Sequence, residues 1–352
     1  MEVERNPVAG YEEVLSFRED SCGLRGFLAI HDTTLGPALG GTRLWSYASE
    51  NEARADALRL SRAMTYKAAL AELPCGGGKT VIRAHAGLKR AAAFEAYGRV
   101  VESLGGRFFT GPDVGITDDD LVALGRTTRH VVHMTSAGRD DINQYTAEGV
   151  WHGMRACLEF AGLQKVRVAI QGVGHVGLSL GRILKRNGLS LVVADIDAAR
   201  AAHAAEELGA EMAAPEEILK VPCDVVAPCA LGGVITEQAA RELRARIVCG
   251  SANNILASPA AVEELARRGI IYAPDYLVNA GGLIRGLEFD LRGRADSTKS
   301  VEKIYARTRH VLELARERGA TTMAIADELA EAFLQAARSQ AQRGIDSAST
   351  PA

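Results

Sequence analysis

Hydrophobic and polar residues alternate in blocks along the chain, and the clearest blocks lie between residues 166 and 195. An apolar run at 166–170 is typical of a buried strand, and from 176 to 187 apolar residues recur at helical spacing. A second apolar run, 191–194, ends directly before Asp195. The pattern therefore predicts a strand, a turn, a helix and a second strand that ends on an acid.

The same alternation extends over the rest of the chain. After Asp195 it predicts a helix at 198–208 and strands at 224–229, at 246–250 and from 270 onward. Before residue 140 it predicts strands at 24–31, 80–83 and 107–110 and helices at 51–73 and 91–104. Strands separated by helices indicate an α/β protein, and in the second half a parallel, doubly wound sheet.

The chain of 352 residues is too long for one ordinary core, so we expect two domains. The polar stretch 136–146 marks the boundary, and a helix at 147–161 enters the second domain. We predict a first domain at 1–140, a second at 141–330, and a C-terminal helix and tail at 331–352.

Composition restricts the class of protein. With 47% hydrophobic and 24% charged residues and a net charge of −3, the chain has no feature of a nucleic-acid-binding or membrane protein. The acidic N-terminus lacks the apolar core of a signal peptide, so we expect a cytoplasmic protein. The six cysteines form no CxxC pair and we predict no metal site; Cys75 is either a packing residue or a reactive thiol.

Between the two best-predicted strands, residues 172–177 spell GxGxxG. In this context Gly172 makes a tight turn, Gly174 lets a pyrophosphate approach, and Gly177 lets the helix pack on the strand. Asp195 stands where an acid accepts hydrogen bonds from a ribose and repels a 2′-phosphate, so NAD is favoured over NADP. The alternative is a glycine turn that binds another nucleotide or none.

Two lysines in the first domain are candidates for chemistry. Lys67 interrupts an apolar helix face that contains Leu60 and Met64, and it either extends its ammonium to water or binds an anion. Lys79 follows three glycines in the run GGGKT, and such glycines are costly in a loop without a task. Partial burial near Lys67 would disfavour its charged form, as suits a general base. The run is not a phosphate-binding P-loop, because no glycine precedes Gly78 at the five-residue spacing that GxxxxGK[ST] requires.

Three further positions, an acid, a pair of glycines and an asparagine, are each open to two interpretations. Asp113 follows a predicted strand and is either a turn-former or a functional acid. Gly40 and Gly41 either bend an ordinary loop or admit a ligand to the backbone. Asn254 follows a buried strand and either forms a turn or bonds to nicotinamide or substrate.

Taken together, these motifs and the stretch 272–284 resemble the Glu/Leu/Phe/Val dehydrogenase superfamily, most closely its leucine and phenylalanine branch. The resemblance covers nearly the whole chain. It implies an N-terminal α/β substrate and oligomerisation domain, a C-terminal Rossmann-type NAD domain, and a cleft between them. It also implies a homo-oligomer whose C-terminal helix packs back near the first domain.

The resemblance implies a role for each matching residue. Lys79 is the catalytic lysine, Asp113 shuttles protons, and Lys67 binds the substrate carboxylate. The implied substrate residues are Leu39, Gly40, Gly41, Met64, Lys67, Gly111, Asn254, Leu283 and Gly286. The implied cofactor residues are Thr146, Gly172, Gly174, His175, Val176, Gly177, Asp195, Cys229, Ala230, Asn254 and Asn279.

The activity implied is NAD-dependent, reversible oxidative deamination of an apolar L-amino acid of the leucine, valine or phenylalanine type. Gly111 and Gly286 stand where leucine-type relatives carry larger residues, so a bulky substrate such as tryptophan is an alternative. Arg285 and residues 142–145 depart from the usual pattern of the family. The chain could also be a catalytically silent NAD-binding homologue. A hydroxy-acid dehydrogenase would instead use a histidine and arginine in place of the paired lysines.

Overall fold

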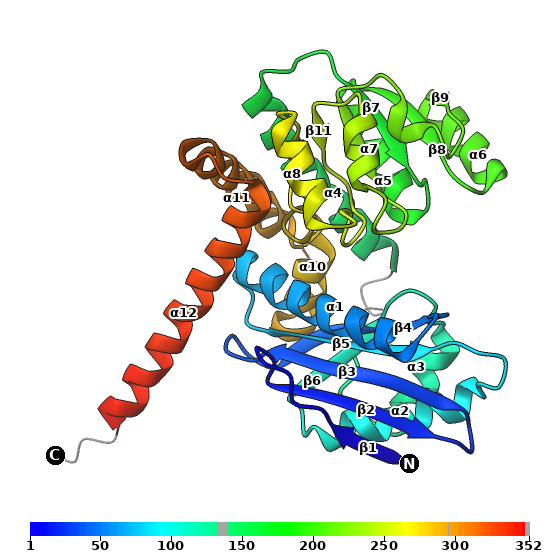
Figure 1. Ribbon diagram of the computed structural model, residues 1–352, viewed down its shortest axis with the longest axis vertical. Coiled ribbons are helices and arrows are strands. Elements are labelled where there is room, and N and C mark those ends of the chain that lie inside the picture. Colours follow the sequence, from blue (N-terminus) through cyan, green and yellow to red (C-terminus); the bar gives the residue numbers. More distant parts are fainter. Residues whose placement is uncertain (133–138, 295, 349–352) are drawn as a thin grey trace. The chain divides into compact units, whose positions relative to one another are not determined.

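The computed structural model describes residues 1–132, 139–294 and 296–348. The chain forms two compact α/β units, Met1–Ser136 with Ala330–Ala352, and Ala137–Leu329, so the predicted two-domain α/β class is confirmed (Figure 1). The boundary predicted at 136–146 falls partly on 133–138, and the predicted tail includes 349–352; both segments lie outside the described residues.

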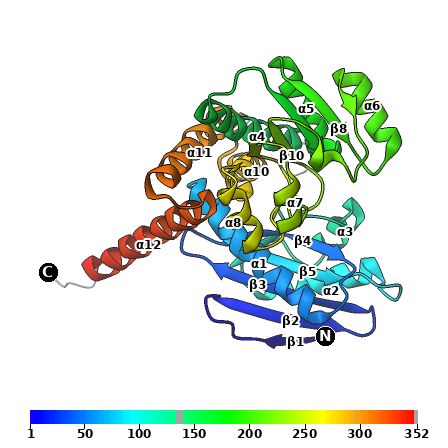
Figure 2. The same cartoon turned by 45° about the horizontal axis from the view of Figure 1, so that its top comes forward.

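Unit 1 contains a mixed sheet of strands in the order β1-β2-β3-β5-β4-β6 (Figure 2). The strands are β1 (Glu2–Arg5), β2 (Glu13–Glu19), β3 (Leu24–Asp32), β4 (Ala38–Trp45), β5 (Gly76–Arg83) and β6 (Phe108–Pro112). Strands β1, β2, β3 and β5 pair antiparallel, whereas β4 is parallel to both β5 and β6. The carboxyl ends of β4, β5 and β6 therefore meet at one edge.

Helices cover both faces of this sheet. They are α1 (Glu50–Leu70) on one face and α2 (Arg90–Ser103) with α3 (Asp118–Gly125) on the other. Val81 packs with Ala53 and Ala57 of α1, and the adjacent Ile82 packs with Phe94 of α2, as the alternation of side chains along a strand requires. Thr117 caps α3.

Unit 2 contains a parallel sheet in the order β12-β11-β10-β7-β8-β9. The strands are β7 (Arg167–Gln171), β8 (Ser190–Ala194), β9 (Glu211–Met212), β10 (Val225–Pro228), β11 (Ile247–Val248) and β12 (Ile271–Tyr272). Chain order reverses at β7, because β8 lies on one side of it and β10 on the other. In parallel sheets of this kind, ligands bind beyond the carboxyl ends of the strands at such a reversal.

The helices of unit 2 lie on both faces of its sheet, which is the predicted doubly wound arrangement. They are α4 (Arg139–Ala161), α5 (His175–Arg186), α6 (Ala198–Leu208), α7 (Glu237–Glu242), α8 (Pro259–Arg267), α9 (Asp275–Val278), α10 (Gly281–Arg292) and α11 (Thr298–Arg318), with the 3-10 turn η1 (Ile218–Lys220). Ala169 packs on the side of α7 and α8, whereas its neighbour Ile170 contacts the side of α5.

Two predicted helices differ in extent from the observed ones. Helix α4 begins at Arg139, before the predicted start at 147, because the polar residues of the expected boundary belong to its first turns. The C-terminal helix predicted from residue 331 begins earlier, as α12 (Thr322–Ala348), and it is separate from α11 because Gly319 adopts a left-handed conformation with φ 61° that ends α11.

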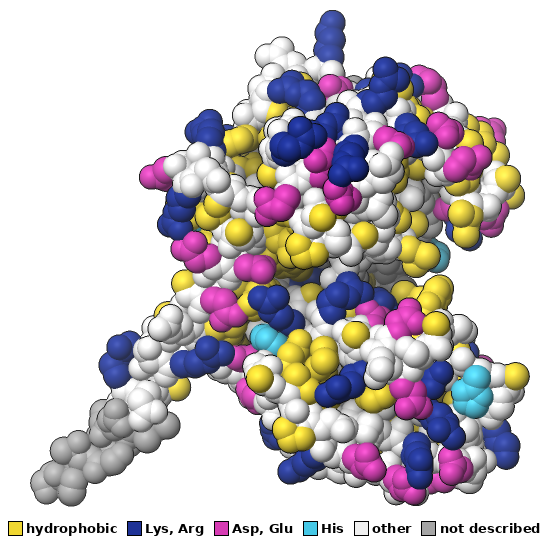
Figure 3. Space-filling view, in the orientation of Figure 1, with side chains coloured by type: hydrophobic (Ala, Val, Ile, Leu, Met, Phe, Trp, Pro, Cys, Tyr) yellow, Lys and Arg dark blue, Asp and Glu magenta, His cyan; other side chains and the backbone are white. Residues whose placement is uncertain are grey.

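The part of α12 beyond residue 329 packs on unit 1. Tyr66 of α1 donates a hydrogen bond to Glu331, and Arg338 forms an ion pair with Asp32. No helix within the described residues has the length and apolar character needed to cross a membrane. Acidic and basic side chains are interspersed on the face that Figure 3 shows.

Candidate functional site

The two residues predicted to be catalytic meet at the edge of the unit 1 sheet. Lys79 lies on β5, Asp113 directly follows β6, and β4 runs between the two strands. Nζ of Lys79 lies 2.6 Å from Oδ2 of Asp113, and the two side chains are only 7% and 16% exposed. The fold thus brings an amine and a carboxylate from separate strands into one nearly buried ion pair.

The glycines before Lys79 belong to a strand, which corrects the predicted loop. Strand β5 already begins at Gly76, and a Cβ added to Gly77 would lie 2.1 Å from the amide nitrogen of Thr65 in α1. The glycine-rich stretch that was expected to be turn-rich is likewise a strand, β4, where a Cβ on Gly40 would lie 1.7 Å from the carbonyl oxygen of Gly78. Close backbone approach, not loop flexibility, therefore accounts for these glycines.

Asp113 is held as a carboxylate by two cations. Burial raises its pKa, but the charges of Lys79 and Arg43 and their hydrogen bonds outweigh burial and lower the pKa to about 2. Nε of Arg43 donates to Oδ2 of Asp113 at 3.1 Å. Arg43 was not among the predicted site residues; the only sign of it in the sequence was its place two residues after Gly41.

A buried layer of hydroxyl groups fixes the three strands directly beneath this pair. The Tyr97 hydroxyl donates to Oγ1 of Thr80 at 2.8 Å and accepts from Oγ1 of Thr42 at 2.9 Å. Oγ1 of Thr42 and Oγ1 of Thr110 lie 2.7 Å apart. Each threonine is the immediate neighbour of a predicted site residue and points to the opposite face, so this layer sets the register of the site.

The predicted substrate residues of unit 1 come from the same elements. Leu39, Gly40 and Gly41 lie on β4, Gly111 lies on β6 directly opposite Gly41, and Met64 and Lys67 lie on α1. Lys67 is buried, with only 8% of the residue exposed. A Cβ added to Gly111 would lie 3.6 Å from the carbonyl oxygen of Val132, which is an ordinary contact distance.

Cys75 is a packing residue. It is buried at 3% exposure, and burial raises the pKa of its thiol to about 12. A thiol with such a pKa forms almost no thiolate at neutral pH.

The glycine turn of unit 2 has the geometry that a dinucleotide requires. Gly172 adopts φ 90°, and a Cβ on Gly177 would lie 2.0 Å from the carbonyl oxygen of Gly172, so both positions demand glycine. Gly174 has no atom within 4 Å of its Cβ position, which leaves its backbone open to an approaching group. His175 and Val176 begin helix α5, whose amide groups face that opening.

Asp195 directly follows β8 and is hydrogen-bonded to the backbone of this turn. Its carboxylate accepts hydrogen bonds from the amides of Val173, at 2.9 Å, and Asp197, at 3.0 Å. Burial raises its pKa, but these amides and Arg200, at 3.1 Å, lower it overall, so the group is ionised. Arg200 also pairs with Asp197, and the two acids leave little of its positive charge for a phosphate.

Further predicted cofactor residues lie around the same turn. A Cβ added to Gly172 would lie 2.7 Å from Cβ of Ala230, and one added to Gly177 would lie 3.2 Å from Cβ of Cys229. Both residues directly follow β10. The structure thus places Cys229 and Ala230 against the glycine turn.

Two asparagines mark the next loops of unit 2. Asn254 has φ 54°, and Glu72 is the other non-glycine residue with positive φ among those described. The side-chain nitrogen of Asn279 donates to Ser251 and Asn253, whereas its Oδ1 is buried and has no partner within the described part of the chain. An orphaned buried acceptor and a strained asparagine are typical of sites completed by a ligand.

Leu283 and Gly286 lie in α10 and are buried, and Thr146 lies in α4, which crosses α10 at Gly282. The two departures from the family pattern meet here. Nε of buried Arg285 lies 2.6 Å from Oδ2 of Asp141, and its guanidinium stacks 5.6 Å from the ring centroid of Tyr145. The buried guanidinium of Arg285 thus has an acid and an aromatic ring as neighbours, both on α4.

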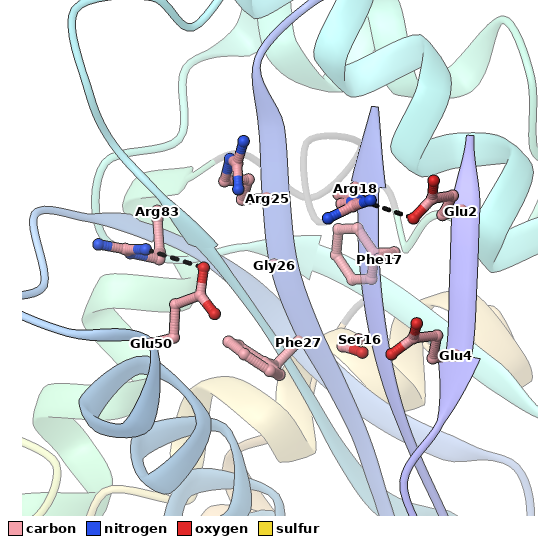
Figure 4. A pocket seen from close by; sticks show the side chains of 10 residues that line it. All are labelled: Glu2, Glu4, Ser16, Phe17, Arg18, Arg25, Gly26, Phe27, Glu50 and Arg83. Carbon is pink, nitrogen blue, oxygen red and sulfur yellow. Dashed lines mark hydrogen bonds and ion pairs between the residues drawn. The ribbon is translucent and has the colours of Figure 1, made fainter. Parts of the chain in front are cut away.

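The linings of three hollows described in unit 1 contain none of the predicted site residues. The one in Figure 4 has a volume of about 150 Å³, and four of its charged groups are paired, Arg18 with Glu2 and Arg83 with Glu50. A second hollow of about 430 Å³ holds as many acids as arginines, for example Asp32 and Arg338. Within the described residues, no group of three or more His, Cys, Asp or Glu side chains is placed to hold a metal ion.

Comparison with known proteins gives consistent matches over most of the chain. Residues 12–136 match the family described as Glu/Leu/Phe/Val dehydrogenase, dimerisation domain, and residues 181–342 match Glutamate/Leucine/Phenylalanine/Valine dehydrogenase. The chain is 43% identical over 339 residues to leucine dehydrogenase of Geobacillus stearothermophilus, which covers 93% of this chain and 92% of that protein.

L-tryptophan dehydrogenase of Nostoc punctiforme is similar to the same degree, 43% identical over 330 residues that cover 92% of this chain and 93% of that protein. The crystal structure of L-tryptophan dehydrogenase from Nostoc punctiforme superimposes with a TM-score of 0.78 at 40% identity, and covers 94% of this chain and 97% of that one.

Proposed function

Because the chain belongs to the Glu/Leu/Phe/Val dehydrogenase family, we propose that it catalyses the NAD-dependent, reversible oxidative deamination of an apolar L-amino acid to the 2-oxo acid and ammonia. The observation that carries the proposal is the nearly buried ion pair of Lys79 and Asp113. A silent NAD-binding protein has no physical reason to keep a desolvated amine and carboxylate in contact, and a hydroxy-acid dehydrogenase would need a histidine and arginine there.

The family uses a nicotinamide cofactor, and the residues of unit 2 fit one. The turn at Gly172, the open backbone at Gly174 and the orphaned Oδ1 of Asn279 are three features that a bound dinucleotide would complete. NAD is proposed over NADP because the ionised Asp195 would repel a 2′-phosphate and because Arg200 is already paired with two acids. When bound, the nicotinamide would accept the α-hydrogen of the substrate as a hydride.

Residues of this chain are proposed to bind the substrate and to carry out the proton transfers. Lys67, with the backbone of Gly40 and Gly41, binds the substrate carboxylate, and Asn254 orients the amine. Lys79, once its ammonium has released a proton, removes a proton from the water that attacks the imino carbon. Asp113, as the carboxylate, takes up and returns protons while the carbinolamine loses ammonia. Positioned acid–base groups of this kind contribute about two to four orders of magnitude in rate.

The substrate side chain is proposed to lie against Leu39, Gly111, Leu283 and Gly286. None of them carries a charge, so a second carboxylate would find no cation, and glutamate is disfavoured. The absence of a side chain at Gly111 and Gly286 supports a substrate side chain larger than that of leucine as the alternative. The leucine and tryptophan relatives are equally similar to this chain, so substrate size has to be measured.

The experiment is NADH formation at alkaline pH with a panel of leucine, valine, phenylalanine, tryptophan and glutamate. We expect turnover with one or more of the four apolar amino acids and none with glutamate. Preference for glutamate would contradict the proposed pocket. Absence of turnover with the whole panel, together with retained NAD binding, would favour the silent homologue.

The assembly is proposed to be a homo-oligomer, since residues 12–136 match a dimerisation domain. Light scattering during size-exclusion chromatography tests this, and a monomer at micromolar concentration would contradict it. The cleft between the domains and the cytoplasmic location stay predictions.

A further inference from the structure

Arg43 links the proposed catalytic pair to helix α1. It lies on β4 with its side chain 17% exposed, and its guanidinium reaches two acids in different directions. Nε donates to Oδ2 of Asp113 at 3.1 Å, and Nη1 donates to Oδ2 of Asp56 at 3.1 Å. A planar guanidinium that bonds to two carboxylates at once is held in one orientation.

Arg43 and Lys79 bond to the same oxygen of Asp113. Nζ of Lys79 lies 2.6 Å from Oδ2, and Nε of Arg43 lies 3.1 Å from that atom. The backbone of β4 also approaches this residue closely, because a Cβ on Gly41 would lie 3.0 Å from Cβ of Asp113. Arg43 therefore limits where Oδ2 can be and how much of its charge acts on Lys79.

The far side of Arg43 is fixed in turn. Asp56 lies on α1, and its Oδ2 also accepts the hydroxyl of Tyr47 at 2.6 Å, while Nη2 of Arg59 reaches its Oδ1 at 2.5 Å. Asp56 thus balances the charge of Arg43 and sets its orientation. The result is a continuous chain of contacts from α1 through Asp56 and Arg43 to Asp113.

We propose that Arg43 is a positioning residue for the deamination, which holds the Asp113 carboxylate in line with Lys79 and is itself oriented by Asp56. The proposal rests on the proposed function, since it assigns Arg43 a task only if Asp113 and Lys79 carry the proton transfers. Arg43 needs no contact with substrate or cofactor for this task.

The test is a double-mutant cycle in which Arg43→Met and Asp113→Asn are made singly and together in the full chain. We expect R43M to lower kcat about 10- to 100-fold, with the KM values for NAD and amino acid changed less than about threefold, since misplacement of a catalytic group by about 1 Å costs this much. In the D113N background, R43M should cost nothing further, because its effect passes through the carboxylate that is already absent.

Two variants keep the test independent of folding. Arg43→Lys retains a cation that reaches one acid but not both, so it should restore part of the lost kcat. Asp56→Asn should lower kcat in the same direction by a smaller factor. Arg83→Met is the matched control, because Arg83 also joins a strand to α1 through an ion pair, with Glu50 at 3.3 Å, but has no contact with Asp113; it should leave kcat unchanged.

The outcomes separate the two proposals. A wild-type chain without amino-acid turnover would overturn the proposed function and this inference with it. An active wild type and an impaired D113N, combined with an R43M effect that is equally large in both backgrounds or absent in both, would overturn the role of Arg43 alone. An R43M effect confined to KM would also contradict it.

Discussion

Replacement of Lys79 by arginine separates the charge of this residue from its capacity to release a proton. Arginine keeps a cation next to Oδ2 of Asp113, where Nζ now lies at 2.6 Å, so the nearly buried carboxylate retains a partner. Because a guanidinium stays protonated at every accessible pH, Lys79→Arg cannot activate water. We therefore expect a folded, NAD-binding protein that turns over slowly.

The magnitude follows from the step that is lost. General acid–base help contributes about two to four orders of magnitude, which corresponds to about 3 to 5 kcal/mol of transition-state stabilisation. Lys79→Arg should lower kcat by this factor, and Lys79→Ala should lower it at least as much while sparing NAD binding. In the alanine variant Asp113 loses the ion pair with Lys79 and keeps the one with Arg43. The free energy of unfolding of this variant should therefore also fall.

The assay is the initial rate of NADH absorbance at alkaline pH with saturating amino acid, accompanied by calorimetric titration of NAD. Lys89→Ala is the matched control, since this exposed lysine bonds only to the carbonyl oxygen of Ser21 among the contacts described. A Lys79→Arg variant that retains a tenth or more of the wild-type kcat would refute the assignment of Lys79 as the base.

Four further outcomes are expected. Asp195→Ala should weaken NAD binding and relax discrimination against NADP; an unchanged ratio of the two kcat/KM values would refute this. Gly111→Leu should lower kcat/KM for tryptophan more than for valine, and an equal effect on both substrates would remove Gly111 from the pocket. Gly77→Ala should lower the denaturant-derived free energy of unfolding by about 1 to 3 kcal/mol, because its Cβ would collide with the backbone of α1, whereas Gly125→Ala, with no atom within 4 Å, should not. Since the pKa of Asp113 is lowered to about 2, its ion pairs should contribute about 2 kcal/mol to the free energy of unfolding. This contribution is fully present above pH about 4 and is lost as the pH falls through about 2. An Asp113→Asn variant whose free energy of unfolding falls with acid as much as that of the wild type would contradict this.

Local sequence patterns were sufficient to predict the strand, helix and second strand around the GxGxxG turn of unit 2. The run 166–170 became β7, the helical spacing from 176 became α5, and the run 191–194 became β8, each within a residue or two of the expected limits. Turn, helix and strand signals agree there because every element is defined by its own residues and their immediate neighbours.

The first unit was harder to predict because its glycines are required by distant neighbours. Gly77 faces α1 and Gly40 faces β5, so both look like loop residues until the packing is known. Arg43 was missed for a similar reason: its two partners, Asp56 and Asp113, come from a helix and from another strand end. Sequence pattern made Lys79 and Asp113 candidates and the resemblance gave them roles, whereas their contact required the sheet order β5-β4-β6.

The central claim is that this chain removes hydride from the α-carbon of an apolar amino acid. The most direct measurement uses the fastest substrate of the panel with deuterium at Cα, and mass spectrometry of the NADH formed together with enzymatic determination of ammonia. The account predicts NADH that carries the deuterium, with ammonia released in equal amount. NADH without the label, or labelled NADH without ammonia, would contradict it.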